Sequence, residues 1–268
     1  MSQDRRRLTR RDVLTLGLSA VVGAVASASI KGPQLPAETG LQTEWSLSGR
    51  QRHWVFVIDT DRCNGCMKCV EACQEEMRVP PSWSEHGYAG RQPWIEVFKM
   101  GDHFLPVLCQ NCQNAPCAKV CPVGATFYSE DEIVLVDQER CIGCRICITA
   151  CPYQRRFFNW FDPPVSEEER NIPYSPDYNI PKRRGVVEKC IWCRHRIKEG
   201  RLPACVEACT AAGHRALFFG DAAEDVVSNG DETVKLSELL KGRGAYRLKE
   251  ELGTEPRVYY LPPRGGSV

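Results

Sequence analysis

Residues 141–152 read CIGCRICITACP, a segment in which four cysteines are separated by two, two and three residues and the last is followed by a proline. Thiols this close together are seldom packing residues, and three of them in one tight loop can hold a common group. Gly143 lies between the first two cysteines and favours such a loop, because glycine accepts backbone dihedrals that other residues avoid. The segment therefore predicts a binding site built from cysteines.

The same pattern recurs along the chain, which has 268 residues and sixteen cysteines. The cysteines fall into four groups of four: Cys63, Cys66, Cys69 and Cys73; Cys109, Cys112, Cys117 and Cys121; Cys141, Cys144, Cys147 and Cys151; Cys190, Cys193, Cys205 and Cys209. Groups one and three share Arg before the first cysteine, Gly between the first two and Ala before the last. Groups two and four share a longer gap before the third cysteine and a nearby proline, Pro116 or Pro203. The chain therefore contains an internal repeat of two cassettes.

Bulk properties exclude several classes of protein. The hydrophobic content of 43% is that of a globular protein, and the net charge of +1 gives no sign of a nucleic-acid-binding surface. No nucleophile elbow or phosphate-binding loop is present, and the five histidines share no metal-ligand spacing. We therefore predict no catalytic residue.

Three kinds of chemistry could use sixteen cysteines. Disulfides suit small secreted domains rather than a chain of this length, and zinc takes four ligands per site without any need for this spacing. In two-cluster bacterial ferredoxins, the run C-x2-C-x2-C-x3-C-P sends its fourth cysteine to the other iron–sulfur cluster. Group three matches this run, and we expect its fourth cysteine to begin a helical segment. Iron–sulfur clusters are the favoured interpretation, with zinc and disulfides as the alternatives.

The four-group pattern resembles the four-cluster ferredoxin-type subunits of the dimethyl sulfoxide reductase family of complexes, over residues 52–221 and the tail ELGTEPRVYYL at 251–261. The resemblance implies four [4Fe–4S] clusters, with groups one and four paired and groups two and three paired. The implied ligand sets are Cys63, Cys66, Cys69 and Cys209 for cluster 1; Cys73, Cys190, Cys193 and Cys205 for cluster 2; Cys109, Cys112, Cys117 and Cys151 for cluster 3; Cys121, Cys141, Cys144 and Cys147 for cluster 4. One departure is Thr210 after Cys209, where such subunits often have proline.

A function follows from this resemblance. A cluster with four cysteine ligands has no open iron, so the chain is expected to relay single electrons without catalysing a reaction itself. The implied partners are a polytopic quinone-binding membrane subunit and a catalytic molybdopterin subunit. The alternative is the equivalent subunit of a sulfite-reduction-associated transmembrane complex, which has cytochrome partners and no molybdenum subunit. A disulfide-stapled secreted binding protein is a remote alternative.

Residues 1–30 are expected to direct export. Residues 9–14 (TRRDVL) resemble the twin-arginine motif, residues 13–30 carry no charge, and Ala26-Ser27-Ala28 fits a cleavage site. An uncleaved membrane anchor is the alternative, although the uncharged run is slightly shorter than the about 20 residues that span a bilayer. We expect the chain on the periplasmic side of the cytoplasmic membrane, attached to it through a partner or through this anchor.

The expected fold is α+β, with two back-to-back bacterial ferredoxin-like modules and long loop insertions. Strands are expected at 53–59, 132–137 and 215–221, and a helix at 233–242. The expected boundaries are a signal or anchor at 1–30, a linker at 31–50, the four-cluster domain at 51–222 with insertions near 74–108 and 160–189, and a C-terminal helix and strand extension at 223–268.

Basic residues crowd two of the groups. Those near groups three and four are Arg140, Arg145, Arg155, Arg156, Lys182, Arg183, Arg184, Lys189, Arg194, Arg196, Lys198 and Arg201. Positive charge beside an anionic cluster favours its reduced form and raises its potential. A solvated basic surface is the alternative, and the sequence does not single out one tuning residue.

Overall fold

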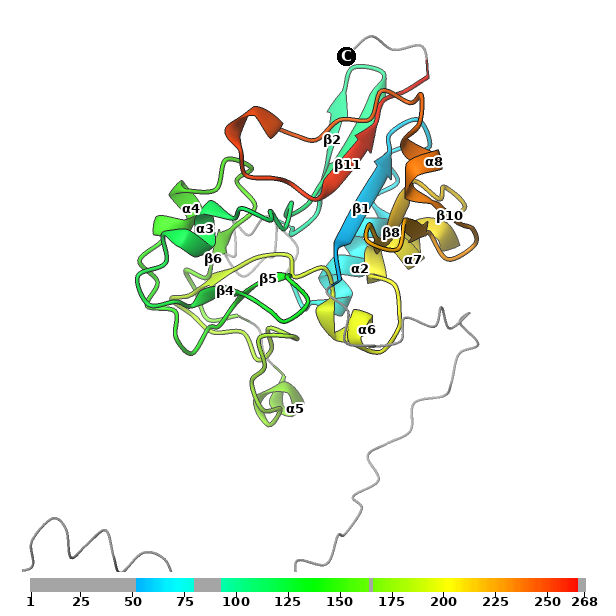
Figure 1. The fold of residues 1–268 in the computed structure, drawn as a ribbon. Helices are drawn as coiled ribbons and strands as arrows, with labels where there is room; N and C mark the ends of the chain where they lie inside the picture. The colour runs from blue at the N-terminus through cyan, green and yellow to red at the C-terminus, as the bar shows by residue number, and fades with distance from the viewer. Residues whose placement is uncertain (1–51, 80–92, 164–165, 265–268) are drawn as a thin grey trace, which may run out of the picture. The chain divides into compact units, whose positions relative to one another are not determined.

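A five-stranded sheet joins residues from both ends of the part of the chain that the structure describes. A computed structural model describes residues 52–79, 93–163 and 166–264. The strands of this sheet, in the order β10-β9-β8-β1-β11, are Thr233–Lys235, Val226–Ser228, Leu217–Asp221, Trp54–Asp59 and Val258–Leu261. The pair β1–β11 is parallel, and the other neighbouring strands are antiparallel. Figure 1 shows β1 in blue beside β11 in red.

The central strand β1 is buried on both faces of this sheet. Its side chains alternate, as a strand requires: Trp54, Phe56 and Ile58 belong to one buried cluster, and Val55 and Val57 belong to another. The first cluster also holds most of the cysteines of groups one and four. The sheet thus provides a wall for the cysteine-rich loops.

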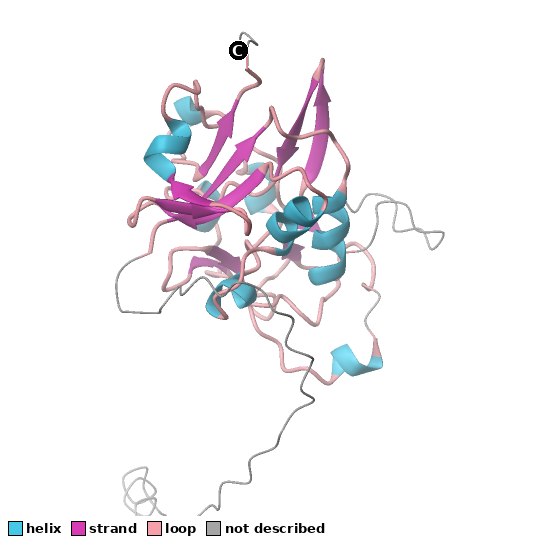
Figure 2. Cartoon of the chain, turned by 90° about the vertical axis from the view of Figure 1, so that its right-hand side faces the viewer, coloured by secondary structure: helices cyan, strands magenta, loops and turns pink. Residues whose placement is uncertain are grey.

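The remaining elements are short and are separated by long loops (Figure 2). The helices are α2 (Lys68–Glu76), α3 (Pro116–Lys119), α4 (Ile146–Thr149), α5 (Glu167–Arg170), α6 (Arg194–Lys198), α7 (Ala204–Ala211) and α8 (Leu236–Leu240), with a 3-10 turn η1 at Glu250–Leu252. The hairpins are β2–β3 (Glu96–Met100 and His103–Val107), β4–β5 (Thr126–Tyr128 and Val134–Val136) and β6–β7 (Phe157–Phe158 and Val187–Glu188).

Two halves follow from this arrangement. The sheet half contains the five-stranded sheet with α2, α6 and α7, and it carries cysteine groups one and four. The hairpin half contains α3, α4, β4–β5 and β6–β7, and it carries groups two and three. Helix α2 packs against α7 in the first half, and α3 packs against α4 in the second. Mixed helix and strand content agrees with the expected α+β class.

The structure confirms the three predicted strands, as β1, β5 and β8. The predicted helix at 233–242 was too long, because Thr233–Lys235 pairs with β9 as a strand and only Leu236–Leu240 is helical. The side chain of Asn229 accepts hydrogen bonds from the backbone N–H groups of Asp231 and Glu232, which closes the turn of this hairpin. The signal segment at 1–30 and the linker at 31–50 lie outside the described residues.

Candidate iron–sulfur sites

Four cavities lie within the described part of the chain, each lined by four cysteines. Cavity 1 is lined by Cys63, Cys66, Cys69 and Cys209; cavity 2 by Cys73, Cys190, Cys193 and Cys205; cavity 3 by Cys109, Cys112, Cys117 and Cys151; cavity 4 by Cys121, Cys141, Cys144 and Cys147. These are the four predicted ligand sets. Together with the open solvent at their mouths, these spaces measure about 330, 320, 340 and 320 Å³ in turn. Four cavities of nearly equal size fit four copies of one group.

The loops of groups one and three have the same backbone form. Gly65 and Gly143 have φ of 77° and 70°, and Met67 and Arg145, two residues later, have φ of 64° and 63°. All four residues are therefore in the left-handed region, which glycine enters without strain. Met67 and Arg145 each immediately precede a helix, α2 or α4. The repeat seen in the sequence thus extends to the backbone.

The expectation that the fourth cysteine begins a helix was wrong. Helices α2 and α4 begin just before the third cysteine, so Cys69 and Cys147 lie in their first turns. The left-handed residue before each helix turns the chain there, which sets the start of the helix. The fourth cysteine then follows one turn later and reaches the next cavity.

Proline starts the helices of groups two and four. Pro116 occupies the first turn of α3, and Pro203 is the N-cap of α7. Proline suits these positions because its missing N–H leaves no helical hydrogen bond unmade. Cys117 lies one residue after Pro116 and Cys205 two residues after Pro203, and they line cavities 3 and 2.

The chemistry of the cysteines fits a multi-iron group. All sixteen are free thiols in the structure, and burial raises the pKa of Cys69, Cys190 and Cys193 to about 12. Buried thiolates therefore need a cationic partner. Among the described residues, no three His, Cys, Asp or Glu side chains converge closely enough for one metal ion. Sulfurs arranged around a cavity rather than a point favour a [4Fe–4S] cluster over zinc.

Two cysteines at equivalent places in the repeat accept hydrogen bonds from the backbone. The N–H of Thr126 donates to Sγ of Cys121 at 3.4 Å, and the N–H of Ala216 donates to Sγ of Cys209 at 3.3 Å. Cys121 and Cys209 are the last cysteines of groups two and four. Such bonds stabilise negative charge on sulfur and raise the potential of a bound cluster.

The cavities follow one another in a row. Cavities 1 and 2 share helix α2, and cavities 3 and 4 share the segment from Cys117 to Cys121. Cavities 2 and 3 are also close to each other. Burial raises the pKa of Cys190 in cavity 2, and the charge of Cys109 in cavity 3 raises it further. Cys66 of cavity 1 and Cys144 of cavity 4 are exposed, whereas all four cysteines of cavity 2 are buried. The row therefore reaches the surface at cavities 1 and 4.

Trp192 connects the two interior cavities and was not singled out in the sequence. Its indole Nε1–H donates to the carbonyl oxygen of Cys109 at 3.0 Å, and the side chain is 1% exposed. Its neighbour Cys193 lines cavity 2, while Cys109 lines cavity 3. The position of Trp192 between the first two cysteines of group four is the sequence feature that could have identified it.

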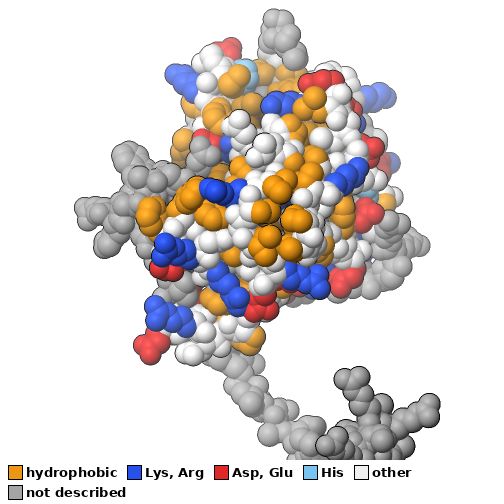
Figure 3. Space-filling view, turned by 90° about the vertical axis from the view of Figure 1, so that its left-hand side faces the viewer, with side chains coloured by type: hydrophobic (Ala, Val, Ile, Leu, Met, Phe, Trp, Pro, Cys, Tyr) orange, Lys and Arg blue, Asp and Glu red, His pale blue; other side chains and the backbone are white. Residues whose placement is uncertain are grey.

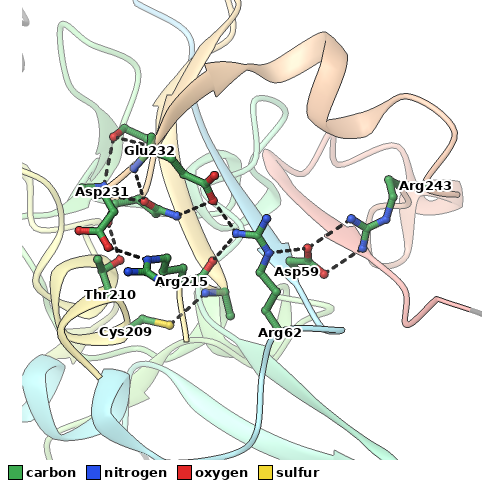
Figure 4. Close-up of polar contacts among 12 residues, drawn as sticks. Asp59, Arg62, Cys209, Thr210, Arg215, Asp231, Glu232 and Arg243 are labelled. Atoms are coloured by element: carbon green, nitrogen blue, oxygen red, sulfur yellow. Dashed lines mark hydrogen bonds and ion pairs between the residues drawn. The ribbon is translucent and has the colours of Figure 1, made fainter. Parts of the chain in front are cut away.

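Thr210, the departure from the usual proline, has a structural role of its own. Figure 4 shows it at the end of α7, near the turn that carries Asp231 and Glu232. Its hydroxyl donates to the carbonyl oxygen of Asn229 at 2.6 Å. Helix α7 runs to Ala211, two residues beyond Cys209, whereas α3 and α4 end before Cys121 and Cys151, each of which proline follows.

An ion-pair chain borders cavity 1 beside Thr210 (Figure 4). Arg62 pairs with Asp59 at 3.3 Å and with Glu232 at 2.5 Å, and Arg243 pairs with Asp59 at 3.0 Å. Arg62 directly precedes the ligand-set residue Cys63. The contacts therefore tie the first cysteine loop to the end of β1 and to the β9–β10 turn.

Comparisons with known proteins support the same chemistry. Models described as 4Fe-4S dicluster domain match residues 100–163 and 133–210, and one described as 4Fe-4S binding domain matches residues 56–78. Together these matches include cysteines of all four groups.

Named relatives match most of the chain. The Hdr-like menaquinol oxidoreductase iron-sulfur subunit 1 of Archaeoglobus fulgidus is 34% identical, over 94% of this chain and 97% of the relative. A tetrathionate reductase subunit of Salmonella typhimurium is 34% identical, over 97% and 88%. A putative dimethyl sulfoxide reductase iron-sulfur subunit of Halobacterium salinarum is 38% identical, over 77% and 78%. The chain belongs to the family of iron–sulfur subunits of dimethyl sulfoxide, tetrathionate and menaquinol oxidoreductases.

Proposed function

We propose that this chain is the non-catalytic electron-transfer subunit of a membrane-bound respiratory oxidoreductase. It binds four [4Fe–4S] clusters, one in each cavity, through the four cysteines that line it. The observation that carries this proposal is the row of four cavities, each with one complete set of cysteines. Since four cysteines occupy four irons of a cubane, no iron is open to substrate, and each cluster exchanges single electrons.

The two ends of the row define where electrons enter and leave. Cavity 1 opens beside Cys66, and cavity 4 opens beside Cys144. Around cavity 4, the lining residues Val123 and Ile142 are 39% and 64% exposed. Figure 3 shows hydrophobic side chains gathered among Lys and Arg on the face over the hairpin half. Exposed apolar surface of this kind supports protein contacts at one end of the relay.

The partners are a polytopic quinone-binding membrane subunit at one end and a catalytic molybdopterin subunit at the other. The names of relatives support a quinone at one end and a reductase at the other, since they include subunits of a menaquinol oxidoreductase and of a tetrathionate reductase. The molybdopterin is what the family resemblance implies. No helix in the described ranges is long and apolar enough to cross a bilayer. In the proposed complex, the chain meets the membrane through its partner or through an anchor within residues 1–30.

The chain works on the periplasmic side of the cytoplasmic membrane after twin-arginine export. The support is the TRRDVL motif and the uncharged run after it. This route carries folded proteins, so the cysteines reach an oxidising compartment already bound to iron. The proposal predicts that a fusion of residues 1–30 to a reporter is exported, and that Arg10→Lys with Arg11→Lys keeps the reporter in the cytoplasm.

A second arrangement keeps the relay and changes the catalytic neighbour. One relative, matched over 97% of its length, is named a menaquinol oxidoreductase subunit, which supports the quinone side and leaves the other partner open. In this arrangement cytochromes replace the molybdopterin subunit.

Purification of the native complex tests both arrangements. The isolated chain, purified without oxygen, is expected to contain about 16 iron atoms. Gentle solubilisation of membranes with a tagged chain then identifies its partners by mass spectrometry and metal analysis. Molybdenum or tungsten with a large subunit supports the first arrangement, and haem without molybdenum supports the second. An anaerobically purified chain without iron would overturn the relay itself.

A further inference from the structure

Lys189 is a buried cation between the two interior cavities. Its side chain lines cavity 3, it directly precedes Cys190 of cavity 2, and it is 1% exposed. Its ammonium group donates to Oδ1 of Asn111 at 3.3 Å, to the carbonyl oxygen of Cys190 at 2.7 Å and to that of Val134. All three acceptors are uncharged. Among the described residues, no carboxylate lies within ion-pair distance of Lys189.

Arg156 is a second buried cation at the same cavity. It lines cavity 3 and is 4% exposed, and its Nη2 donates to the hydroxyl of Thr126 at 2.7 Å. Its Nε and Nη1 have no hydrogen-bond partner within the described chain, nor does it form an ion pair there. The sulfurs of Cys117, Cys109 and Cys151 of cavity 3, and that of Cys147 of cavity 4, act electrostatically on its guanidinium. The guanidinium therefore lies beside cavity 3 and also contacts the Cys147 thiol of cavity 4, where its donors are available to an anionic group.

Most of the other buried cations near the cysteine groups have acidic partners, whereas Arg257 donates to the backbone carbonyl oxygens of Asn111 and Glu132 and forms no ion pair within the described residues. Lys182 pairs with Glu188 at 2.9 Å. Arg194 contacts Glu130, Asp131 and Asp177, and Arg196 contacts Glu76 and Glu207. The positive charge of these residues is largely balanced locally, unlike that of the two cations at cavity 3.

The internal repeat supplies a comparison for each cation. Leu108 precedes the first cysteine of group two as Lys189 precedes that of group four, and Leu108 lines cavity 2. Arg78 follows the last cysteine of group one by the same offset as Arg156 follows that of group three. Arg78 is exposed, pairs with Glu169 at 3.0 Å and lines neither interior cavity. Related positions therefore give cavity 2 an apolar lining and cavity 3 two buried positive charges.

We infer that Lys189 and Arg156 make the cluster of cavity 3 the more easily reduced of the two interior clusters, so that it holds an electron between transfers. This inference rests on the proposed binding of clusters. Each reduction moves one electron from a neighbouring reduced cluster, which is oxidised, and no bond or proton changes. The added negative charge is stabilised by cations buried beside it, because the protein interior screens charge weakly. The lining of cavity 2 is apolar apart from its cysteines, and of the two cations only Lys189 acts on it, through Cys190.

A potentiometric titration followed by EPR tests the inference on the full chain, purified without oxygen. Arg156→Gln and Lys189→Gln remove charge and keep hydrogen-bond donors, whereas Arg156→Lys keeps charge. Arg78→Gln is the matched control at the equivalent, exposed position. Cys112→Ser identifies the signal of cavity 3, since Cys112 lines that cavity alone.

At a fixed applied potential, each Gln variant is expected to lower the ratio of reduced to oxidised cluster in that signal at least tenfold. For one electron, a tenfold change in this ratio corresponds to a shift of 59 mV in the midpoint potential. Arg156→Lys and Arg78→Gln are expected to change it less than twofold. The inference is overturned if both Gln variants leave this signal within twofold, or if cavity 2 responds more strongly. Loss of the cavity 3 iron in both Gln variants would also overturn it, because the cations would then serve assembly rather than potential. A wild-type chain without iron would refute the proposed function, whereas four signals with no shift would refute this inference alone.

Discussion

Cys69 and Cys73 lie one turn apart on helix α2, and they line different cavities. Residues four apart share a helix face, so this one face forms part of the wall of both cavities. Cys205 and Cys209 on α7 repeat the relationship in the opposite direction, with Cys205 at cavity 2 and Cys209 at cavity 1. The packing of α2 against α7 therefore joins each cavity from two distant parts of the chain.

This crossing predicts which substitutions act together. Cys66→Ala and Cys209→Ala, although far apart in sequence, should alter the same EPR signal because both residues line cavity 1. Cys205→Ala should alter a different signal, although Cys205 is only four residues from Cys209. If Cys205→Ala and Cys209→Ala altered the same signal, the assignment of cysteines to cavities would be wrong.

Gly143→Ala should remove the cluster of cavity 4. Gly143 has φ of 70°, and an added Cβ would collide with the backbone carbonyl oxygen of Gly185. We expect a loss of about four of about 16 iron atoms. Gly124→Ala is the control, since Gly124 has φ of 62° with open space around it and the substitution should cost only about 1–2 kcal/mol of backbone strain. Equal iron contents in the two variants would contradict the role of the close approach.

Much of the site could be predicted because cysteine spacing reflects local geometry. The glycines at 65 and 143, the two loop–helix units and the prolines at 116 and 203 are all within a few residues of the ligands they position. The grouping of distant cysteines was implied only by family resemblance, and the structure brings those cysteines together. Whether they bind clusters stays a prediction.

Other features depend on contacts that the sequence does not encode locally. Strand β11 lies beside β1 only because the chain returns after about 200 residues to complete the sheet. Lys189 and Arg184 were both named as basic residues near cysteines, yet one is buried and the other is exposed. Their difference arises from tertiary packing, which is why no tuning residue could be named from the sequence.

Thr210→Val should loosen the β9–β10 turn. The substitution keeps the shape of the side chain and removes the hydroxyl that donates to the carbonyl oxygen of Asn229. We expect a loss of about 1 kcal/mol, seen as faster hydrogen exchange of the Asp231 and Glu232 amides. Thr149→Val, at an exposed position of α4, should leave that exchange unchanged. Equal exchange in both variants would show that this hydrogen bond does not hold the turn.

Glu76 should contribute to stability in a way that depends on pH. A hydrogen bond from His195, together with the charge of Arg196, lowers the pKa of Glu76 from 4.5 to about 2. A carboxyl group whose pKa is lowered by folding stabilises the folded state at any pH above the pKa that it has in the unfolded chain. This contribution is lost as pH falls from about 4.5 to about 2. Thermal unfolding at several pH values should show Glu76→Gln less stable than wild type at pH 7, with the difference narrowing in that acidic range. Glu75→Gln, at an exposed neighbouring position, should follow wild type, and parallel curves for Glu76→Gln and wild type would contradict the coupling.

Removal of iron should unfold the hairpin half before the sheet half. The buried cluster of the hairpin half has seven residues, of which Cys112, Cys117 and Cys147 are three, so little core remains there without bound clusters. The sheet half keeps the apolar packing of β1 against β8, including Phe56 against Phe219 with ring centroids 5.1 Å apart. Limited proteolysis after anaerobic chelation should therefore cut within residues 111–160 before it cuts β1 or β8, and reconstitution with iron and sulfide should restore resistance. If the sheet were cut first, or if the chelated chain resisted the protease as well as the loaded one, the clusters would not be what holds the hairpin half together.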